Sequence, residues 1–158
     1  MAKPANLMEA TVPPFELRFE YANENRQATI SLGATGVAIL TFLLIFLNGR
    51  FSAGGLPGLL YRITLGSVVV SIFFLGISGS YYYFLLEALE RGRSDASRFL
   101  READAFFVLG LALLLLEPAL ILITLEIYDI GAIAIALWAI SMVVIGYGRR
   151  VLSRPAVP

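Results

Sequence analysis

The chain contains neither cysteine nor histidine among its 158 residues. This absence excludes disulfides, iron–sulfur clusters, haem held by either residue and the usual zinc sites, because all of these depend on thiolate or imidazole ligands. It also removes the thiol and imidazole groups on which much of enzyme catalysis relies. We therefore expect no enzyme, no metal centre and no cofactor.

A net charge is missing as well. Twelve Lys and Arg residues balance twelve Asp and Glu residues, so the chain has no electrostatic attraction for nucleic acid. The first 27 residues hold three prolines and seven charged residues in place of a basic segment followed by an apolar core. We expect no cleavable signal peptide there.

Apolar residues are abundant, at 58% of the chain, and the mean hydropathy is +0.80. A helix of roughly 20 apolar residues crosses about 30 Å of hydrocarbon, and a chain within lipid must pair its own backbone groups. Four runs meet that length or approach it: 28–47, 60–86, 105–125 and 130–147. The sequence predicts an all-α fold, an integral membrane four-helix bundle with cytoplasmic helical extensions.

The basic residues predict an orientation. Ten of the twelve Lys and Arg residues fall before the first run, between the second and third runs, or after the fourth; only Arg50 and Arg62 fall elsewhere. The positive-inside rule then places both termini in the cytoplasm. We expect a multi-pass protein with a cytoplasmic segment at 1–27 and a cytoplasmic basic tail at 148–158.

Helices are also predicted outside the apolar runs. FELRFEYANENRQ follows two prolines and favours an amphipathic helix whose stripe of Phe15, Phe19 and Ala22 packs on the neighbouring hairpin. The alternative is an acidic vestibule that gathers cations, because Glu16, Glu20 and Glu24 share a face.

The second run is expected to continue beyond the membrane. Its helix should extend to Gly92, a suitable left-handed cap, and Ser94 or Asp95 should begin the next helix. This pattern predicts a hairpin that projects into the cytoplasm.

Small residues follow one face of the first and fourth runs. In lipid, small side chains let helix backbones approach closely, and they are the usual packing surface. We expect helix packing at Gly33, Gly36, Ala132, Ala136 and Ala139.

Tyrosines are placed mainly near the ends of the runs. An interfacial belt accounts for Tyr82 and Tyr83, with Tyr147 at the same level and Tyr61 and Tyr128 at the opposite surface. Tyr81 lies deeper, so we expect it to face the interior of the bundle.

One carboxylate lies within the most apolar stretch, LLLLEPALILITL. Glu117 falls near the middle of its run, where an acid costs roughly 2.5–3.5 kcal/mol and should face the bundle interior or water. Pro118 removes the helical donor of the Leu114 carbonyl and favours a kink. Ser71 and Ser78 are expected near the same depth. Either Glu117 is a neutral structural acid at the kink, or it is the proton or cation site of a pathway.

Two functions fit these features. The first is an oligomeric membrane channel or ion-coupled transporter subunit with a path for a proton or small cation near Glu117, Ser71, Ser78 and Tyr81. The alternative is a non-catalytic accessory or scaffold subunit of a larger membrane complex. The expected partners are the lipid bilayer and either further copies of the chain or other subunits.

Overall fold

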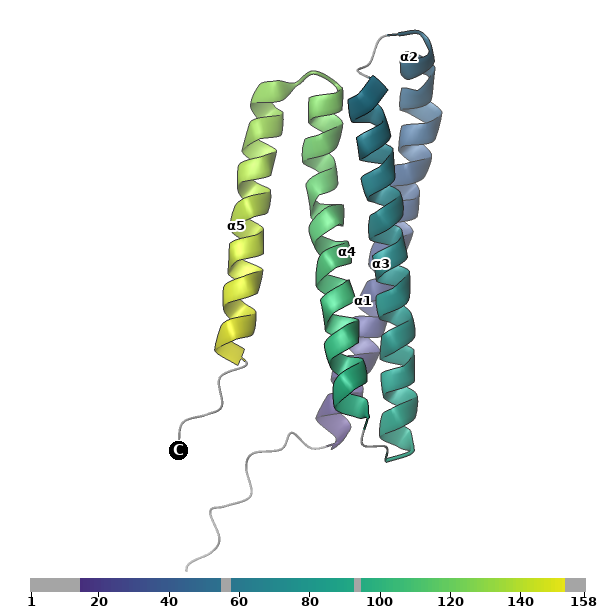
Figure 1. Cartoon of the computed structure of the whole chain (residues 1–158), viewed down its shortest axis with the longest axis vertical. Helices are drawn as coiled ribbons and strands as arrows, with labels where there is room; N and C mark the ends of the chain where they lie inside the picture. The colour runs from purple at the N-terminus through teal and green to yellow at the C-terminus, as the bar shows by residue number, and fades with distance from the viewer. Residues whose placement is uncertain (1–14, 55–57, 93–94, 153–158) are drawn as a thin grey trace, which may run out of the picture.

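All secondary structure in the described residues is helical. The computed structural model describes residues 15–54, 58–92 and 95–152. The elements are α1 (Phe15–Phe42), η1 (Leu43–Leu47, a π-helix), α2 (Asn48–Ser52), α3 (Gly58–Glu90), α4 (Ala96–Thr124) and α5 (Tyr128–Leu152). They form an up-and-down helical bundle (Figure 1), so the all-α prediction is confirmed.

Four helical segments are long and apolar enough to cross a membrane: 18–52, 58–90, 96–124 and 128–147. The chain is therefore a multi-pass membrane protein. The first segment joins α1, η1 and α2, and no break separates the predicted N-terminal amphipathic helix from the first span.

The connection between α3 and α4 has the predicted form. Gly92 has a φ of +63°, which is the left-handed conformation that a glycine cap adopts without strain. Asp95 is the N-cap of α4, and its carbonyl accepts hydrogen bonds from the amides of Arg98 and Phe99. We call this end of the bundle the hairpin end.

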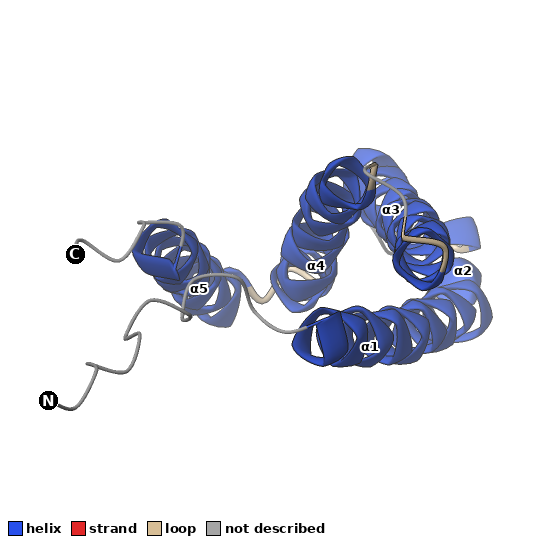
Figure 2. Cartoon of the chain, turned by 90° about the horizontal axis from the view of Figure 1, so that it is seen from below, coloured by secondary structure: helices blue, strands red, loops and turns tan. Residues whose placement is uncertain are grey.

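Helices α1, α3 and α4 enclose the core. Seen along the bundle, they form a triangle, while α5 lies beside α4 and away from α1 and α3 (Figure 2). Two clusters of buried residues fill the triangle, one near Tyr82 and Leu85 at the hairpin end and one near Leu43 and Val68 at the opposite end.

Most buried residues of these helices follow a heptad pattern, and the buried residues outside the set below are Leu47, Leu86, Ala88, Leu114 and Ala119. The residues of the set recur every seven positions along the first span and α4, and at alternate steps of three and four along α3. The positions are Ala22, Thr29, Gly36 and Leu43; then Tyr61, Thr64, Val68, Ser71, Leu75, Ser78, Tyr82 and Leu85; then Ala103, Gly110, Glu117 and Thr124. This repeat keeps one seam of each helix facing its partners, as in coiled-coil packing.

Close approach between helices is required at two glycines of the triangle, and a third, Gly131 of α5, lies as close to Ile123 of α4. A Cβ atom at Gly36 would lie 2.7 Å from Ile72 Cγ1, and one at Gly110 would lie 2.8 Å from Leu75 Cγ and 3.1 Å from its backbone nitrogen. Gly36 therefore lies at a tight helix contact as expected. Gly33 does not, because a Cβ there would meet nothing within 4 Å.

Helix α5 packs on α4 through few contacts. The Trp138 indole donates a hydrogen bond of 2.8 Å to the Ala112 carbonyl. The small residues expected to pack, Ala132, Ala136 and Ala139, are all exposed. Because these side chains are exposed, helix packing at these positions stays a prediction.

A π-helix interrupts the first span, and the apolar sequence LLIFL gives no signal for it. The Leu43 carbonyl accepts from the Asn48 amide and from the Tyr61 hydroxyl at 3.2 Å. Tyr61 is 2% exposed and stacks on Phe51 with ring centroids 4.9 Å apart. The prediction that Tyr61 belongs to a lipid-facing belt is wrong, because its hydroxyl satisfies a carbonyl inside the protein.

Candidate intramembrane carboxylate site

Glu117 is completely buried inside the triangle of α1, α3 and α4. It occupies the α4 seam position that Ala103, Gly110 and Thr124 also occupy, so the heptad packing turns it inward. Among the described residues, neither of its carboxylate oxygens has a hydrogen-bond partner. A buried polar group without a partner is rare in folded proteins and calls for an explanation.

A serine hydroxyl lies beside the carboxyl group but is engaged elsewhere. Ser67 faces Glu117 from α3, yet its hydroxyl donates to the Thr64 carbonyl at 2.9 Å. Ser71, also completely buried, donates to the Val68 carbonyl at 3.1 Å. The fold thus places the Ser67 hydroxyl close enough to interact with the carboxyl group, but its hydrogen bond goes to a carbonyl of its own helix.

A pair of threonines closes the site toward the end opposite the hairpin. The Thr64 and Thr124 hydroxyl oxygens are 2.9 Å apart, and both side chains are buried. Each hydroxyl also lies within hydrogen-bond distance of a carbonyl of its own helix, Leu60 for Thr64 and Leu120 for Thr124. This contact fixes the register between α3 and α4 about two turns of α4 beyond Glu117.

Ser78 is far from Glu117, so the prediction that it shares the carboxylate's depth is wrong. Its hydroxyl donates to the Ala103 carbonyl at 2.9 Å, fourteen positions from Glu117, or about 21 Å at 1.5 Å per residue. In an antiparallel hairpin centred near Gly92, the α3 residues opposite Glu117 are those near Ser67 and Ser71. Of the two serines predicted at the depth of Glu117, Ser71 lies at that depth and Ser78 does not.

An apolar layer separates the Glu117 site from the contact between Ser78 and Ala103. Leu75, which is completely buried, packs against Gly110, and Leu114 is buried one turn of α4 closer to Glu117. The carboxyl group is therefore shielded on the side of the hairpin end.

A second polar cluster lies at the hairpin end. The Tyr82 hydroxyl donates to Asp104 Oδ1 at 2.6 Å, and the Tyr21 hydroxyl donates to the same oxygen at 3.3 Å. One carboxylate thereby joins α1, α3 and α4. Tyr82 is 0% exposed, so its assignment to the lipid-facing belt is wrong, whereas Tyr83 is exposed as expected.

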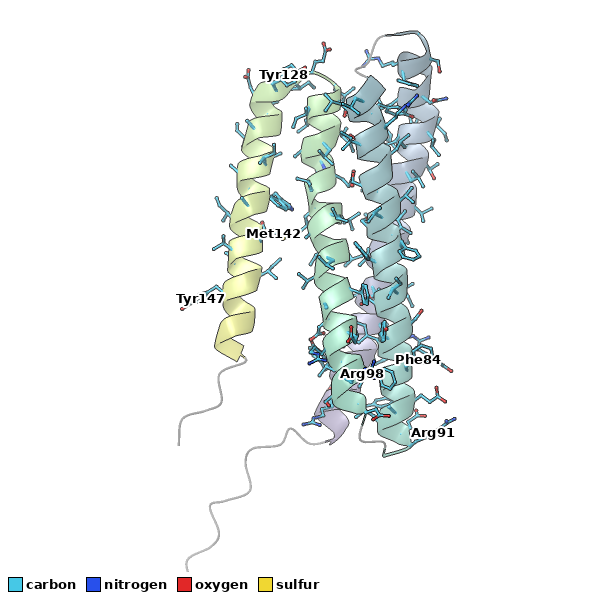
Figure 3. The ribbon with its side chains drawn as sticks, in the orientation of Figure 1. Phe84, Arg91, Arg98, Tyr128, Met142 and Tyr147 are labelled. Carbon is cyan, nitrogen blue, oxygen red and sulfur yellow. The ribbon has the colours of Figure 1, made fainter. Side chains whose placement is uncertain are left out.

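The remaining tyrosines take other positions. Tyr81 is half-buried and stacks on Phe106 with ring centroids 5.7 Å apart, in a row of aromatic rings rather than beside Glu117. On α5, Tyr128 and Tyr147 are exposed, and Tyr147 points away from the bundle (Figure 3). Their exposure fits the predicted belt.

The N-terminal part of α1 packs as the amphipathic interpretation expects. Ala22 is completely buried, and Phe19 packs against the cluster at the hairpin end. Glu20 and Glu24 are exposed, and the side chains of Phe15 and Glu16 lie outside the described residues.

Pro118 lies inside α4, which continues without interruption from Ala96 to Thr124. The proline ring is exposed, whereas Glu117 before it and Ala119 after it are buried. Pro118 therefore frees a backbone carbonyl one turn earlier without taking space inside the triangle.

No group of three or more Asp or Glu side chains that would suit a metal ion is found in the described part of the chain. No family model, curated protein or solved structure matches the sequence or the fold. The candidate site is thus defined by its own geometry: one buried carboxyl group, adjacent hydroxyls and an apolar layer.

Proposed function

We propose that this protein is a subunit of an ion-coupled membrane transporter in which Glu117 binds the coupling proton or small cation. The observation that carries the proposal is the complete burial of Glu117 with both oxygens unpartnered. An intramembrane acid is costly and marks a functional site by default. A bound proton or cation would satisfy a group that the fold leaves without a partner.

Burial favours a transporter over an open channel. A pore between identical subunits needs its carboxylate on an outer face, at the symmetry axis, whereas Glu117 points into its own subunit. The layer of Leu75 and Leu114 on one side and the Thr64–Thr124 contact on the other are consistent with an occluded state. Access of the proton or cation to Glu117 would then require a movement of the helices, with Pro118 as a natural hinge.

The exposed face of α5 supports a second candidate, a non-catalytic accessory or scaffold subunit. Its small residues Ala132, Ala136 and Ala139 suit close contact with another membrane helix. Either candidate implies further subunits. Both termini are proposed to be cytoplasmic; a cysteine introduced at the exposed Ser52 should then react with reagents outside the cell, and protection of that cysteine would reverse the orientation.

Flux in liposomes tests the transporter. Purified protein is reconstituted, and proton, sodium and potassium fluxes are followed for the wild type, Glu117→Gln and Glu126→Gln. Glu126 is an exposed acid just beyond α4 and serves as the matched control. We expect Glu117→Gln to reduce flux to the background leak, while Glu126→Gln retains the flux of the wild type. The amide is similar in shape to the carboxyl group, but it can neither take up and release a proton nor balance the charge of a cation.

Equal flux through wild type and Glu117→Gln would overturn the role of Glu117. No flux through the wild type, together with copurification of a larger membrane protein, would favour the scaffold.

A further inference from the structure

A groove runs along the outer surface of the bundle between α1 and α3. Its volume is about 570 Å³, and all of its lining residues come from these two helices. Exposed apolar side chains form the walls, among them Ile30, Val37 and Phe84. The groove is separate from the Glu117 site, which lies inside the triangle.

Glycines form part of the groove surface without being needed for helix packing. A Cβ atom at Gly33 or Gly76 would meet nothing within 4 Å, in contrast to the tight contacts at Gly36 and Gly110. Glycine inside a helix costs roughly 0.5–1 kcal/mol relative to alanine. Contacts within the chain do not explain glycine at positions 33 and 76, whereas an occupant lying against the backbone does.

A positive charge marks the hairpin end of the groove. The Arg26 guanidinium lies over the Tyr83 ring, 5.6 Å from its centroid, which holds the charge at the groove. No ion pair of Arg26 is found among the described residues. Glu87, one turn of α3 beyond Tyr83, pairs with Arg91 at 2.7 Å.

We propose that the groove binds one anionic phospholipid, with its phosphate at Arg26 and an acyl chain over Gly33 and Gly76. The groove extends along α1 from Arg26 to Val37, eleven residues or about 16 Å, which is half of a hydrocarbon core about 30 Å thick. It therefore spans one leaflet, with the arginine at headgroup level. Arginine is well suited to phosphate, because its N–H groups match the phosphate oxygens.

Charge also argues against a helix from a second copy as the occupant. Helix α5 is the least covered helix, and its C-terminal end carries Arg149 and Arg150. In a copy of the same orientation, this basic end of the chain would lie on the same side of the bilayer as Arg26, and the like charges would repel. An anionic headgroup is complementary where α5 is not.

Native mass spectrometry tests the lipid. Delipidated full-length protein in mild detergent is titrated with phosphatidylglycerol and with phosphatidylcholine. Gly76→Leu fills the groove, and Gly66→Leu is the matched control, because Gly66 is an exposed glycine of α3 that is also free of contacts and is not part of the groove. Arg26→Gln removes the charge, with Arg98→Gln, an exposed arginine at the same end, as its control.

We expect one phosphatidylglycerol to bind about tenfold more tightly than phosphatidylcholine. Arg26→Gln should abolish that preference, and Gly76→Leu should abolish binding of both lipids, while the two controls match the wild type. Unchanged binding by Gly76→Leu would overturn the location, and an unchanged preference in Arg26→Gln would overturn the role of the charge. A change of oligomeric state in Gly76→Leu without a change in lipid binding would identify a second copy as the occupant and refute the proposal.

Discussion

Helices α4 and α5 have similar apolar content but different surroundings. In the most apolar window of α4, 22% of residues are buried, compared with 6% in α5. The seam of α4 meets two helices at once, and its small residues at positions 103 and 110 let α3 approach. Among the small residues of α5, Gly131 packs closely against Ile123 of α4 next to the turn, whereas Ala132, Ala136 and Ala139 are exposed. Small residues permit close packing, but a partner of matching shape must be present for the contact to form.

The largest expected effect is at a glycine of the core. Gly110→Leu should lower the free energy of unfolding by about 1–3 kcal/mol, because its side chain would overlap Leu75, including the Leu75 backbone. Gly146→Leu on α5 should change it by less than about 0.5 kcal/mol, because a Cβ there meets nothing. Unfolding in mild detergent measures both. Equal losses would mean that α5 is packed as tightly as the core.

A smaller effect is expected at the polar cluster of the hairpin end. Tyr82→Phe removes a buried hydroxyl that donates to Asp104 and should cost about 1–2 kcal/mol in the same assay. Tyr83→Phe is the control, because that neighbouring side chain is exposed. A loss of stability in Tyr83→Phe that matches the loss in Tyr82→Phe would contradict the assignment of Tyr82 to the core.

The smallest effect is expected at the junction of α4 and α5. Trp138→Phe removes the hydrogen bond to Ala112 and should cost about 0.5–1.5 kcal/mol, confined to the attachment of α5. Hydrogen exchange should therefore speed up in α5 while α3 keeps its protection. Faster exchange throughout α3 would show that α5 is part of the cooperative core.

The positions of some site residues can be predicted from the sequence, and the positions of others cannot. The burial of Glu117 follows from the cost of an acid in lipid, and the left-handed Gly92 from its position after a long helix. The depth of Ser78 was predictable too: counting back from the Gly92 turn brings Ser67 and Ser71 opposite Glu117. Which of Tyr81 and Tyr82 faces the interior depends on the heptad positions of α3. The small residues of the second run alone did not predict those positions.

The sequence by itself determined four apolar helices and one carboxyl group within them, because lipid leaves a backbone no partner but itself and tolerates few charges. The tertiary structure decided which three helices enclose Glu117, that its oxygens lack partners, that a π-helix interrupts the first span and that α5 stands apart. These features depend on the shapes of two or three helices at once. In lipid, burying one leucine against another gains little over contact with acyl chains, so the apolar pattern of a single helix does not specify its neighbours.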